Sequence, residues 1–288
     1  MAKVGIIGGS GLYEMEGLAD VEAVDIMDSP FGRPSDHFVT GQLNGVNVVF
    51  LSRHGRGHKI SPSQINYRAN IFGMKKLGVD AIISVSACGS LKENIKPLDF
   101  VVVDQFVDRT NRKREASFFT EGIVAHVSFA EPVAPELTEI LIGCAKDVGA
   151  TVHERGTYVN MEGPQFSTKA ESNLYRSWGL DVIGMTNMTE AKLAREAEIS
   201  YATLAAVTDY DCWHDGHDSV TVEMIIENLT KNVENAKKIL MMAIPRIGAL
   251  TEFSARDALK NAIVTDPTVI SEKQKKELTI LIGKYLSG

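Results

Sequence analysis

The 288-residue chain has little that would place it in a membrane or outside the cell. Its only cysteines are Cys88, Cys144 and Cys212, an odd number that argues against a disulfide framework and suits a reducing cytoplasm. No apolar run approaches the ~20 residues that a membrane-spanning helix needs. The first residues enter a strand pattern at once and have no signal-peptide profile. We therefore expect a cytoplasmic protein that does not contact membranes.

Positive charge is also in deficit. The 30 Lys and Arg residues stand against 37 Asp and Glu residues, which gives a formal net charge of -7 at pH 7. This balance leaves no basic footprint for nucleic acid, so any bound anion must be captured locally by a few cations and main-chain amides. With 44% hydrophobic and 23% charged residues, the composition indicates a globular enzyme or small-molecule binder with ample core.

Two common phosphate-binding fingerprints are absent. The glycine turn Gly8–Gly11 closes the first apolar run, but Glu14 stands where a dinucleotide-binding motif has its third glycine. No Gly-Lys-Ser/Thr follows, which excludes a P-loop. His54 and His58 are four residues apart, yet the glycines between them disfavour a helix and no third ligand is near. We therefore expect neither a metal nor a cofactor.

Short apolar segments alternate with helix-like segments through most of the chain. Their near-continuous apolarity is typical of strands covered on both faces. The expected strands are Val4–Ile7, Val46–Leu51, Ala81–Val85, Phe100–Val103, Val182–Met185 and Ser200–Val207. The expected helices run from Ser61 to Leu77, across Val133–Val148, onward from about Thr221, and across Ser271–Leu286. The pattern predicts one α/β domain over residues 1–288, with a central mixed, mostly parallel sheet flanked by helices and a C-terminal helix at about 271–287.

Two carboxylates one residue apart close the last apolar strand. Asp209 and Asp211 follow Ile199–Val207, at the edge where open α/β sheets bind ligands. Two acids in a desolvated pocket repel each other, so one is expected to be protonated near neutral pH. A neutral carboxylic acid can donate to purine N7, while a carboxylate can accept from a 6-amino group. The alternative is a simple turn after a strand, where Asp is common.

Other strand ends carry groups that could bind a phosphate. They combine hydroxyls, main-chain amides in small-residue turns, and one planar guanidinium beside a histidine. Each turn could be explained by packing alone, but together they would meet at one edge of the sheet. One strong cation, neutral donors and no acid cluster of the Mg²⁺-binding type favour free orthophosphate. The candidate groups are Ser10, Arg53, His54, Ser86, Ala87 and Thr186.

A phosphate site and a purine site in one pocket predict phosphorolysis of an N-glycosidic bond. Asp209 is the candidate general acid at N7, and orthophosphate is the nucleophile. Cys88 and Cys212 are then packing residues, since no protein nucleophile is required. Three alternatives remain: a nucleosidase that uses water, a broad purine nucleoside phosphorylase that accepts a 5′-hydroxyl, and a non-catalytic nucleotide sensor. The guanidinium of Arg53 argues against the nucleosidase, because water needs no cation.

Six short motifs, in family order between about residues 3 and 250, resemble the 5′-methylthioadenosine phosphorylase family. This family is a branch of the trimeric purine nucleoside phosphorylases. Any one motif alone would be weak, but six in register are specific. They are Gly8–Gly11, Ser29–Gly32, Arg53–Gly55, Ala87–Ser90, Glu162–Phe166 and Thr208–Trp213.

The resemblance implies a homotrimer that converts 5′-methylthioadenosine and orthophosphate to adenine and 5-methylthioribose 1-phosphate. It implies that the six candidate groups above hold the phosphate and that no cofactor is needed. One departure is Gly184, where some relatives have Asn, and this leaves the strictness of adenine selection open. The implied substrate contacts are Phe166, Ser167 and Met185 beside the purine and ribose, Asp209 and Asp211 at the adenine edge, Val222 and Ile225 around the 5′-alkylthio group, and His126 from a neighbouring subunit.

Overall fold

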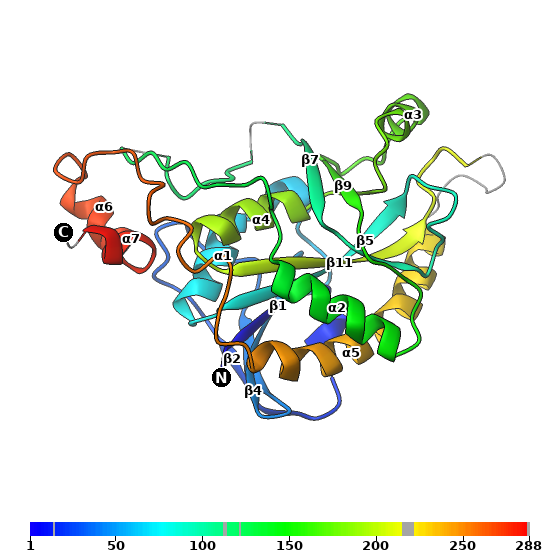
Figure 1. The fold of residues 1–288 in the computed structure, drawn as a ribbon, viewed down its shortest axis with the longest axis horizontal. Helices are drawn as coiled ribbons and strands as arrows, with labels where there is room; N and C mark the ends of the chain where they lie inside the picture. The colour runs from blue at the N-terminus through cyan, green and yellow to red at the C-terminus, as the bar shows by residue number, and fades with distance from the viewer. Residues whose placement is uncertain (14, 112–113, 121, 215–221, 287–288) are drawn as a thin grey trace.

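The computed structural model describes residues 1–13, 15–111, 114–120, 122–214 and 222–286; the side chains at 10, 13 and 222–225 are outside this description. Two layers of helices enclose a central mixed sheet, as the sequence predicts (Figure 1). No helix of the described residues is long and apolar enough to span a membrane.

Eleven strands of the described chain form the sheet, and most of the ladders are parallel. The central path follows the order β2-β3-β4-β1-β5-β10-β9-β7, with β11, β6 and β8 extending from β5. The strands are β1 (Val4–Gly8), β2 (Leu18–Val24), β3 (Phe38–Leu43), β4 (Val46–Ser52), β5 (Ala81–Ser90), β6 (Phe100–Val102), β7 (Gln105–Arg109), β8 (Val152–His153), β9 (Thr157–Met161), β10 (Val182–Gly184) and β11 (Ser200–Asp209).

Strand β5 lies at the centre of the sheet, and its two edges are paired differently. Along one edge β11 runs parallel to it, from Ser200 opposite Ala81 to Asp209 opposite Gly89. Along the other edge β1 pairs only as far as Ser84, and β10 begins only at Gly89. Residues 85–88 therefore have no partner strand on this edge among the described residues, and we call this stretch the open edge of β5.

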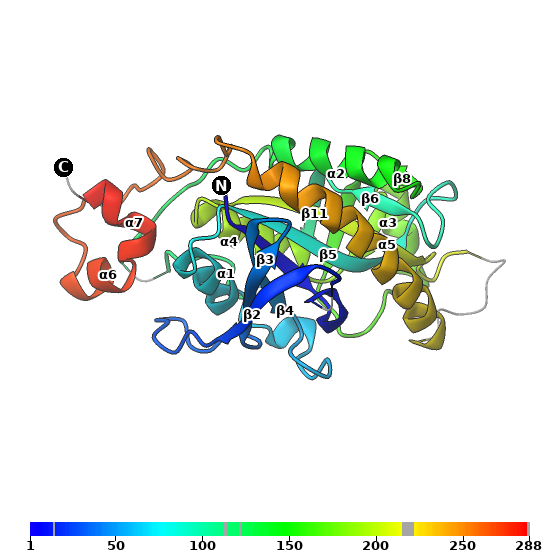
Figure 2. The same cartoon turned by 90° about the horizontal axis from the view of Figure 1, so that it is seen from below.

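Helices cover both faces of the sheet, which explains the continuous burial of β1, β5 and β11. On one face α2 (Pro135–Asp147) and α5 (Val222–Gly248) lie side by side against the inward residues of β1, β4 and β11 (Figure 2). On the other face α1 (Tyr67–Lys76) and α4 (Asn187–Glu196) pack over alternate residues of the same strands. The remaining helices are α3 (Lys169–Ser177), α6 (Glu272–Glu277) and α7 (Thr279–Leu286), with 3₁₀ turns η1 (Ser10–Tyr13) and η2 (Pro62–Gln64).

Three sequence expectations about local structure were wrong. The helix expected from Ser61 is a 3₁₀ turn followed by α1, whose true cap is Asn66, with Oδ1 accepting from Ala69 N at 3.1 Å. The turn expected after Val85 is instead the second half of β5. The expected single C-terminal helix is two helices that meet at Leu278, although Ser271 does cap the first with Gln274.

Candidate active site

A cavity of about 420 Å³ opens at the open edge of β5, where β1 and β10 separate. This volume is in the range of small-molecule sites. The wall is formed by the ends of β4, β5, β10 and β11, by the glycine turn after β1, and by one side of α5. Ligand sites at the carboxyl ends of strands are typical of α/β sheets, and here a gap between strands deepens the site.

The structure brings most of the predicted site residues into this one wall. Ser167 is not in the wall but lies beside it, where its carbonyl accepts from Cys212 Sγ at 3.3 Å. His126 is exposed and does not line the cavity. The side chains of Ser10, Val222 and Ile225 lie outside the described residues. Those that line the cavity are Arg53, His54, Ser86, Ala87, Phe166, Met185, Thr186, Asp209 and Asp211.

Arg53 reaches the cavity from the end of β4, but most of its guanidinium is engaged inside the protein. Only 3% of the residue is exposed. Nη1 donates to Val85 O at 3.1 Å, Nη2 donates to Ser84 Oγ at 2.6 Å, and Glu190 of α4 forms a bidentate ion pair with it. Burial by itself would lower the pKa of Arg53, but Glu190 raises it above its ordinary value. The free cation that the sequence suggests is therefore a neutralised pair.

Sequence reasoning missed Glu190, although a signal was available. Glu190 follows Asn187 by three residues and precedes Ala194 by four, and both of these are fully buried. A helix carries such positions on one face, so the pattern places an acid against the sheet. Other candidates for binding an anion are main-chain N–H groups that face the open edge and the start of α4 at Thr186, where a helix N-terminus carries partial positive charge.

His54 is held as a neutral ring at the mouth of the anion end. Burial and the nearby Arg53 lower the pKa of His54 to about 4. Its Nδ1 lies 2.8 Å from Ile60 O, and its ring stacks on His58 at 4.1 Å between centroids. Because a carbonyl can only accept, Nδ1 carries the proton and Nε2 is an acceptor. His54 therefore offers an acceptor nitrogen, Nε2, as one of the residues that line the cavity.

Asp209 and Asp211 form the opposite end of the cavity. Both are buried, and a register shift between Val207 and Asp209 marks a bulge at the point where β11 meets the cavity. Asp209 Oδ2 accepts from Thr208 Oγ1 at 2.7 Å, and Oδ1 accepts from Asp211 N at 2.7 Å. A side chain at Gly89 would place its Cβ 2.9 Å from Asp209 Oδ1, so a glycine is needed opposite this carboxylate.

The two acids have raised pKa values, as expected, but for a different main reason. Burial raises the pKa of Asp209 to about 6, and the charge of Asp211 adds the smallest contribution. Burial also raises the pKa of Asp211. Desolvation therefore dominates over the mutual repulsion on which the sequence argument relied. A carboxyl that titrates near pH 6 is suited to proton transfer at neutral pH.

Residues outside the wall hold both ends of the cavity in place, and the sequence analysis did not identify them. Asn228 and Asn232 of α5 donate to Thr208 O and Val207 O, at 2.7 and 2.9 Å, and so hold the end of β11. Arg114, from a segment with no clear pattern, donates to Met185 O and Glu162 O, each at 2.5 Å. It thereby ties Met185 to the loop that leads to Phe166.

Comparison with known proteins agrees with this geometry. A family model described as the phosphorylase superfamily matches residues 3–245. The chain belongs to this superfamily. It is 56% identical over 283 residues to the S-methyl-5′-thioadenosine phosphorylase of Geobacter sulfurreducens, covering 98% of this chain and 99% of that protein. It is 58% identical over 289 residues to the protein of the same name from Thermosynechococcus vestitus, covering 99% of each.

Solved structures in this superfamily share the fold. A methylthioadenosine phosphorylase from an antarctic soil metagenomic library matches with a TM-score of 0.93 and 50% identity, over 97% of this chain and 98% of that one. Methylthioadenosine phosphorylase from Schistosoma mansoni, solved in complex with adenine, matches with a TM-score of 0.83 and 36% identity, over 98% of each chain. The resemblance that the six motifs indicated is confirmed.

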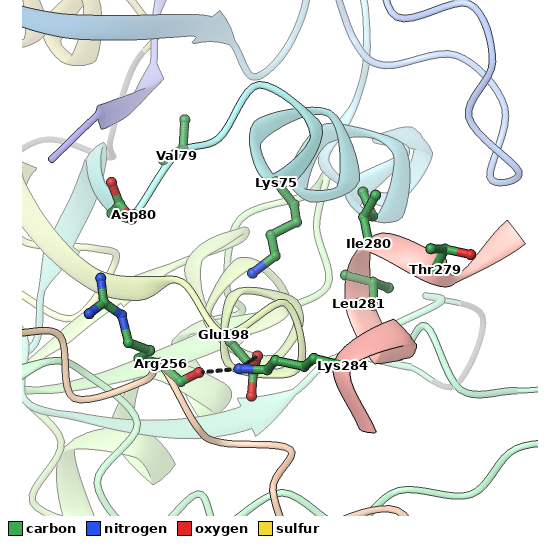
Figure 3. A pocket seen from close by; sticks show the side chains of 9 residues that line it. All are labelled: Lys75, Val79, Asp80, Glu198, Arg256, Thr279, Ile280, Leu281 and Lys284. Carbon is green, nitrogen blue, oxygen red and sulfur yellow. Dashed lines mark hydrogen bonds and ion pairs between the residues drawn. The ribbon is translucent and has the colours of Figure 1, made fainter. Parts of the chain in front are cut away.

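A second cavity, of about 240 Å³, lies away from the phosphorylase site, where α7 packs against α1 and the turn after α4 (Figure 3). We call it the C-terminal cavity. Glu198 is 7% exposed here and accepts from Lys284 Nζ at 2.8 Å, from Tyr285 Oη at 2.5 Å and from Leu259 N at 3.1 Å. Its carboxylate thereby joins α7 and the segment before it to the body of the fold.

Proposed function

We propose that the protein catalyses phosphorolysis of 5′-methylthioadenosine to adenine and 5-methylthioribose 1-phosphate. The observation that carries this proposal is the shared cavity, which has an anion-binding end at the open edge of β5 and two buried acids at the other end. A reaction between a phosphate and a purine nucleoside needs both ends in one space. Relatives that cover the whole chain at more than 50% identity bear the name of this activity.

The chemistry follows from where charge develops. Breaking the C1′–N9 bond moves electrons into the purine and leaves oxocarbenium character on the sugar. Asp209, whose pKa burial raises to about 6, protonates N7 as the base departs and contributes on the order of 10²–10⁴-fold. Asp211 accepts from the 6-amino group. Orthophosphate attacks C1′, and binding it beside the nucleoside removes much of the entropic cost of a bimolecular step.

The phosphate ligands in this proposal are Ser86, Ala87 and Thr186, with His54 and Arg53 behind them, and with Ser10, whose side chain the structure does not describe. Phe166 and Met185 flank the purine and ribose. No cofactor takes part, because orthophosphate supplies the nucleophile.

The 5′-group is proposed to be alkylthio because of α5. Val222 and Ile225 are the sequence candidates, and their side chains are not described. One and two turns further on, Leu229 and Val233 line the same cavity. These side chains offer no partner for a 5′-hydroxyl, which disfavours the broad purine nucleoside phosphorylase.

We further propose a cytoplasmic homotrimer in which His126 completes a neighbouring site. His126 is exposed and remote from its own cavity wall. Beside it Val124 and Val264 are 49% and 67% exposed and are joined by a hydrogen bond from Val264 N to Val124 O at 2.8 Å. Exposed apolar residues that adjoin an exposed histidine are suited to a subunit contact.

The test is release of free base from 5′-methylthioadenosine with and without inorganic phosphate, with 5′-methylthioinosine as the matched substrate. We expect phosphate-dependent release of adenine and poor release of hypoxanthine. Release without phosphate would make the protein a nucleosidase. Equal use of both nucleosides would show that Asp209 and Asp211 do not select the base, and tight binding without turnover would indicate a sensor.

A further inference from the structure

Tyr158 of β9 is a buried tyrosine, and neither the packing nor the proposed mechanism explains why it carries a hydroxyl. The side chain is fully buried in a cluster with Val101, Val182 and Val207. Among the described residues its Oη makes no hydrogen bond. Leaving a buried polar atom unpaired costs about 1–3 kcal/mol, and phenylalanine would fill the same apolar space without that cost. The hydroxyl is therefore unexplained by packing.

The position of this hydroxyl relates it to the active-site cavity. Tyr158 lies opposite Val182 in the parallel ladder of β9 and β10, and its ring runs along the strands toward Gly184. A Cβ at Gly184 would lie 1.8 Å from Tyr158 Oη. Gly184 lines the cavity, so Oη occupies the volume that a side chain from the cavity wall would otherwise fill. The glycine allows the hydroxyl to sit directly behind this wall.

Ser86 is a polar neighbour of Tyr158 on this wall. Its hydroxyl is close enough to lower the pKa of Tyr158, which burial raises on balance, so Tyr158 keeps its proton at neutral pH. The Ser86 proton itself is directed to Ala87 O at a long 3.3 Å. An anion at the open edge of β5 would draw this proton away. Ser86 Oγ keeps its lone pairs in either orientation of this proton, and Tyr158 is a buried donor with no other hydrogen-bond partner among the described residues.

We propose that Tyr158 is a positioning residue of the phosphate site, which donates to Ser86 Oγ and so directs the Ser86 proton to the bound orthophosphate. The inference rests on the proposed function, since it takes orthophosphate as the co-substrate. It assigns Tyr158 to the anion end of the cavity, away from the purine and from Asp209. Tyr158 touches neither substrate and acts only through Ser86.

The first test is Tyr158→Phe, which removes one oxygen and keeps the ring. We expect the KM for phosphate to rise about five- to tenfold, the loss expected for one hydrogen bond. The KM for the nucleoside and kcat at saturating phosphate should stay within about twofold of wild type. The control is Tyr175→Phe, which removes a hydroxyl from another buried tyrosine, 3% exposed, in a different cluster. An unchanged KM for phosphate, or equal rises in both KM values, would overturn the inference.

A double-mutant cycle with Ser86→Ala tests the route of the effect. If Tyr158 acts through Ser86, adding Tyr158→Phe to Ser86→Ala should change the KM for phosphate by less than about twofold. Additive effects would mean that Tyr158 does not act through Ser86.

Calorimetric titration of inorganic phosphate into the nucleoside-free wild-type and variant proteins separates a failure of this inference from a failure of the proposed function. Phosphate-independent release of adenine by the wild type would refute the function, whereas equal phosphate affinity of wild type and Tyr158→Phe would refute only the role of Tyr158.

Discussion

The active-site cavity and the C-terminal cavity bury carboxylates in opposite ways. In the active-site cavity Asp209 and Asp211 are 7% and 8% exposed, and no described residue forms an ion pair with either. In the C-terminal cavity Glu198 is equally buried but lies beside Lys284, which neutralises it (Figure 3). It also accepts a hydrogen bond from Tyr285. The uncompensated pair has raised pKa values and is ready to exchange protons, whereas the compensated acid fixes chain segments. The same residue chemistry serves catalysis or architecture according to whether a cation is nearby.

Among substitutions that test this difference between the two cavities, Asp209→Asn is expected to have the largest effect, which is on kcat. Asp209→Asn keeps the shape and the acceptor for Asp211 N but removes the transferable proton. We expect kcat to fall by about 10²–10⁴-fold with a much smaller change in nucleoside binding. Steady-state kinetics at saturating phosphate, together with a direct binding measurement, would check this. Weaker binding with kcat near that of wild type would show that Asp209 is not the general acid.

The next effect is on stability, at the compensated acid. Glu198→Gln weakens the bonds to Lys284 and Tyr285 and should lower the free energy of unfolding by about 1.5–3 kcal/mol, the worth of a charged hydrogen bond. Values of kcat/KM should stay within about twofold, because Glu198 is remote from the wall of the active-site cavity. Glu277→Gln is the control, since Glu277 forms only an exposed pair with Lys273 at 3.9 Å. Equal unfolding curves for the two variants would show that the buried ion pair of Glu198 does not stabilise the fold more than the exposed pair of Glu277.

The smallest effect is the pH dependence of stability. Asp209 has a pKa of about 6 when folded, above the roughly 3.9 of an unfolded chain. The folded state therefore binds more protons between these values, and stability falls as pH rises through this window. Asp209→Asn removes the penalty, so linkage alone would make the variant more stable than wild type by about 3 kcal/mol at most at pH 7, and the lost acceptor for Thr208 Oγ1 reduces this gain. The gap should close toward pH 4 in urea unfolding. A constant gap across this range would assign the effect to packing instead.

The sheet was largely predictable because its central strands are buried on both faces. The expected strands that became β1, β4, β5, β6, β10 and β11 agree to within a few residues, except that β5 and β11 run on through Ser90 and Asp209. The strands that were missed are the edge strands β2, β7 and β8, together with β3 and β9, which lie next to edge strands. β2 is mostly exposed, and β7 is only partly buried, so neither has a continuous apolar run. Helix α3 was missed because few of its residues are buried.

The candidate site was predictable as a set of strand ends but not as a geometry. Spacing indicated Asp209, Arg53 and Thr186 because each follows an apolar run. It could not indicate that Arg53 would be neutralised by Glu190, a residue 137 positions away in the sequence. Nor could it indicate Arg114, whose contacts to Glu162 and Met185 are formed only by tertiary packing. Long-range pairings of this kind leave no periodic signal in the sequence.

The open edge of β5 has a consequence for how this protein can change. Side chains can be exchanged by point mutation, but the main-chain N–H groups of residues 85–88 that face the open edge cannot, because every residue type except proline supplies the same N–H group. The purine end depends on two exchangeable carboxyl side chains, Asp209 and Asp211. We therefore expect random mutagenesis to alter the choice of base far more readily than the use of an anionic co-substrate. The main-chain part of the proposed anion end is a property of the fold, whereas its side-chain ligands and the proposed base preference are properties of individual residues.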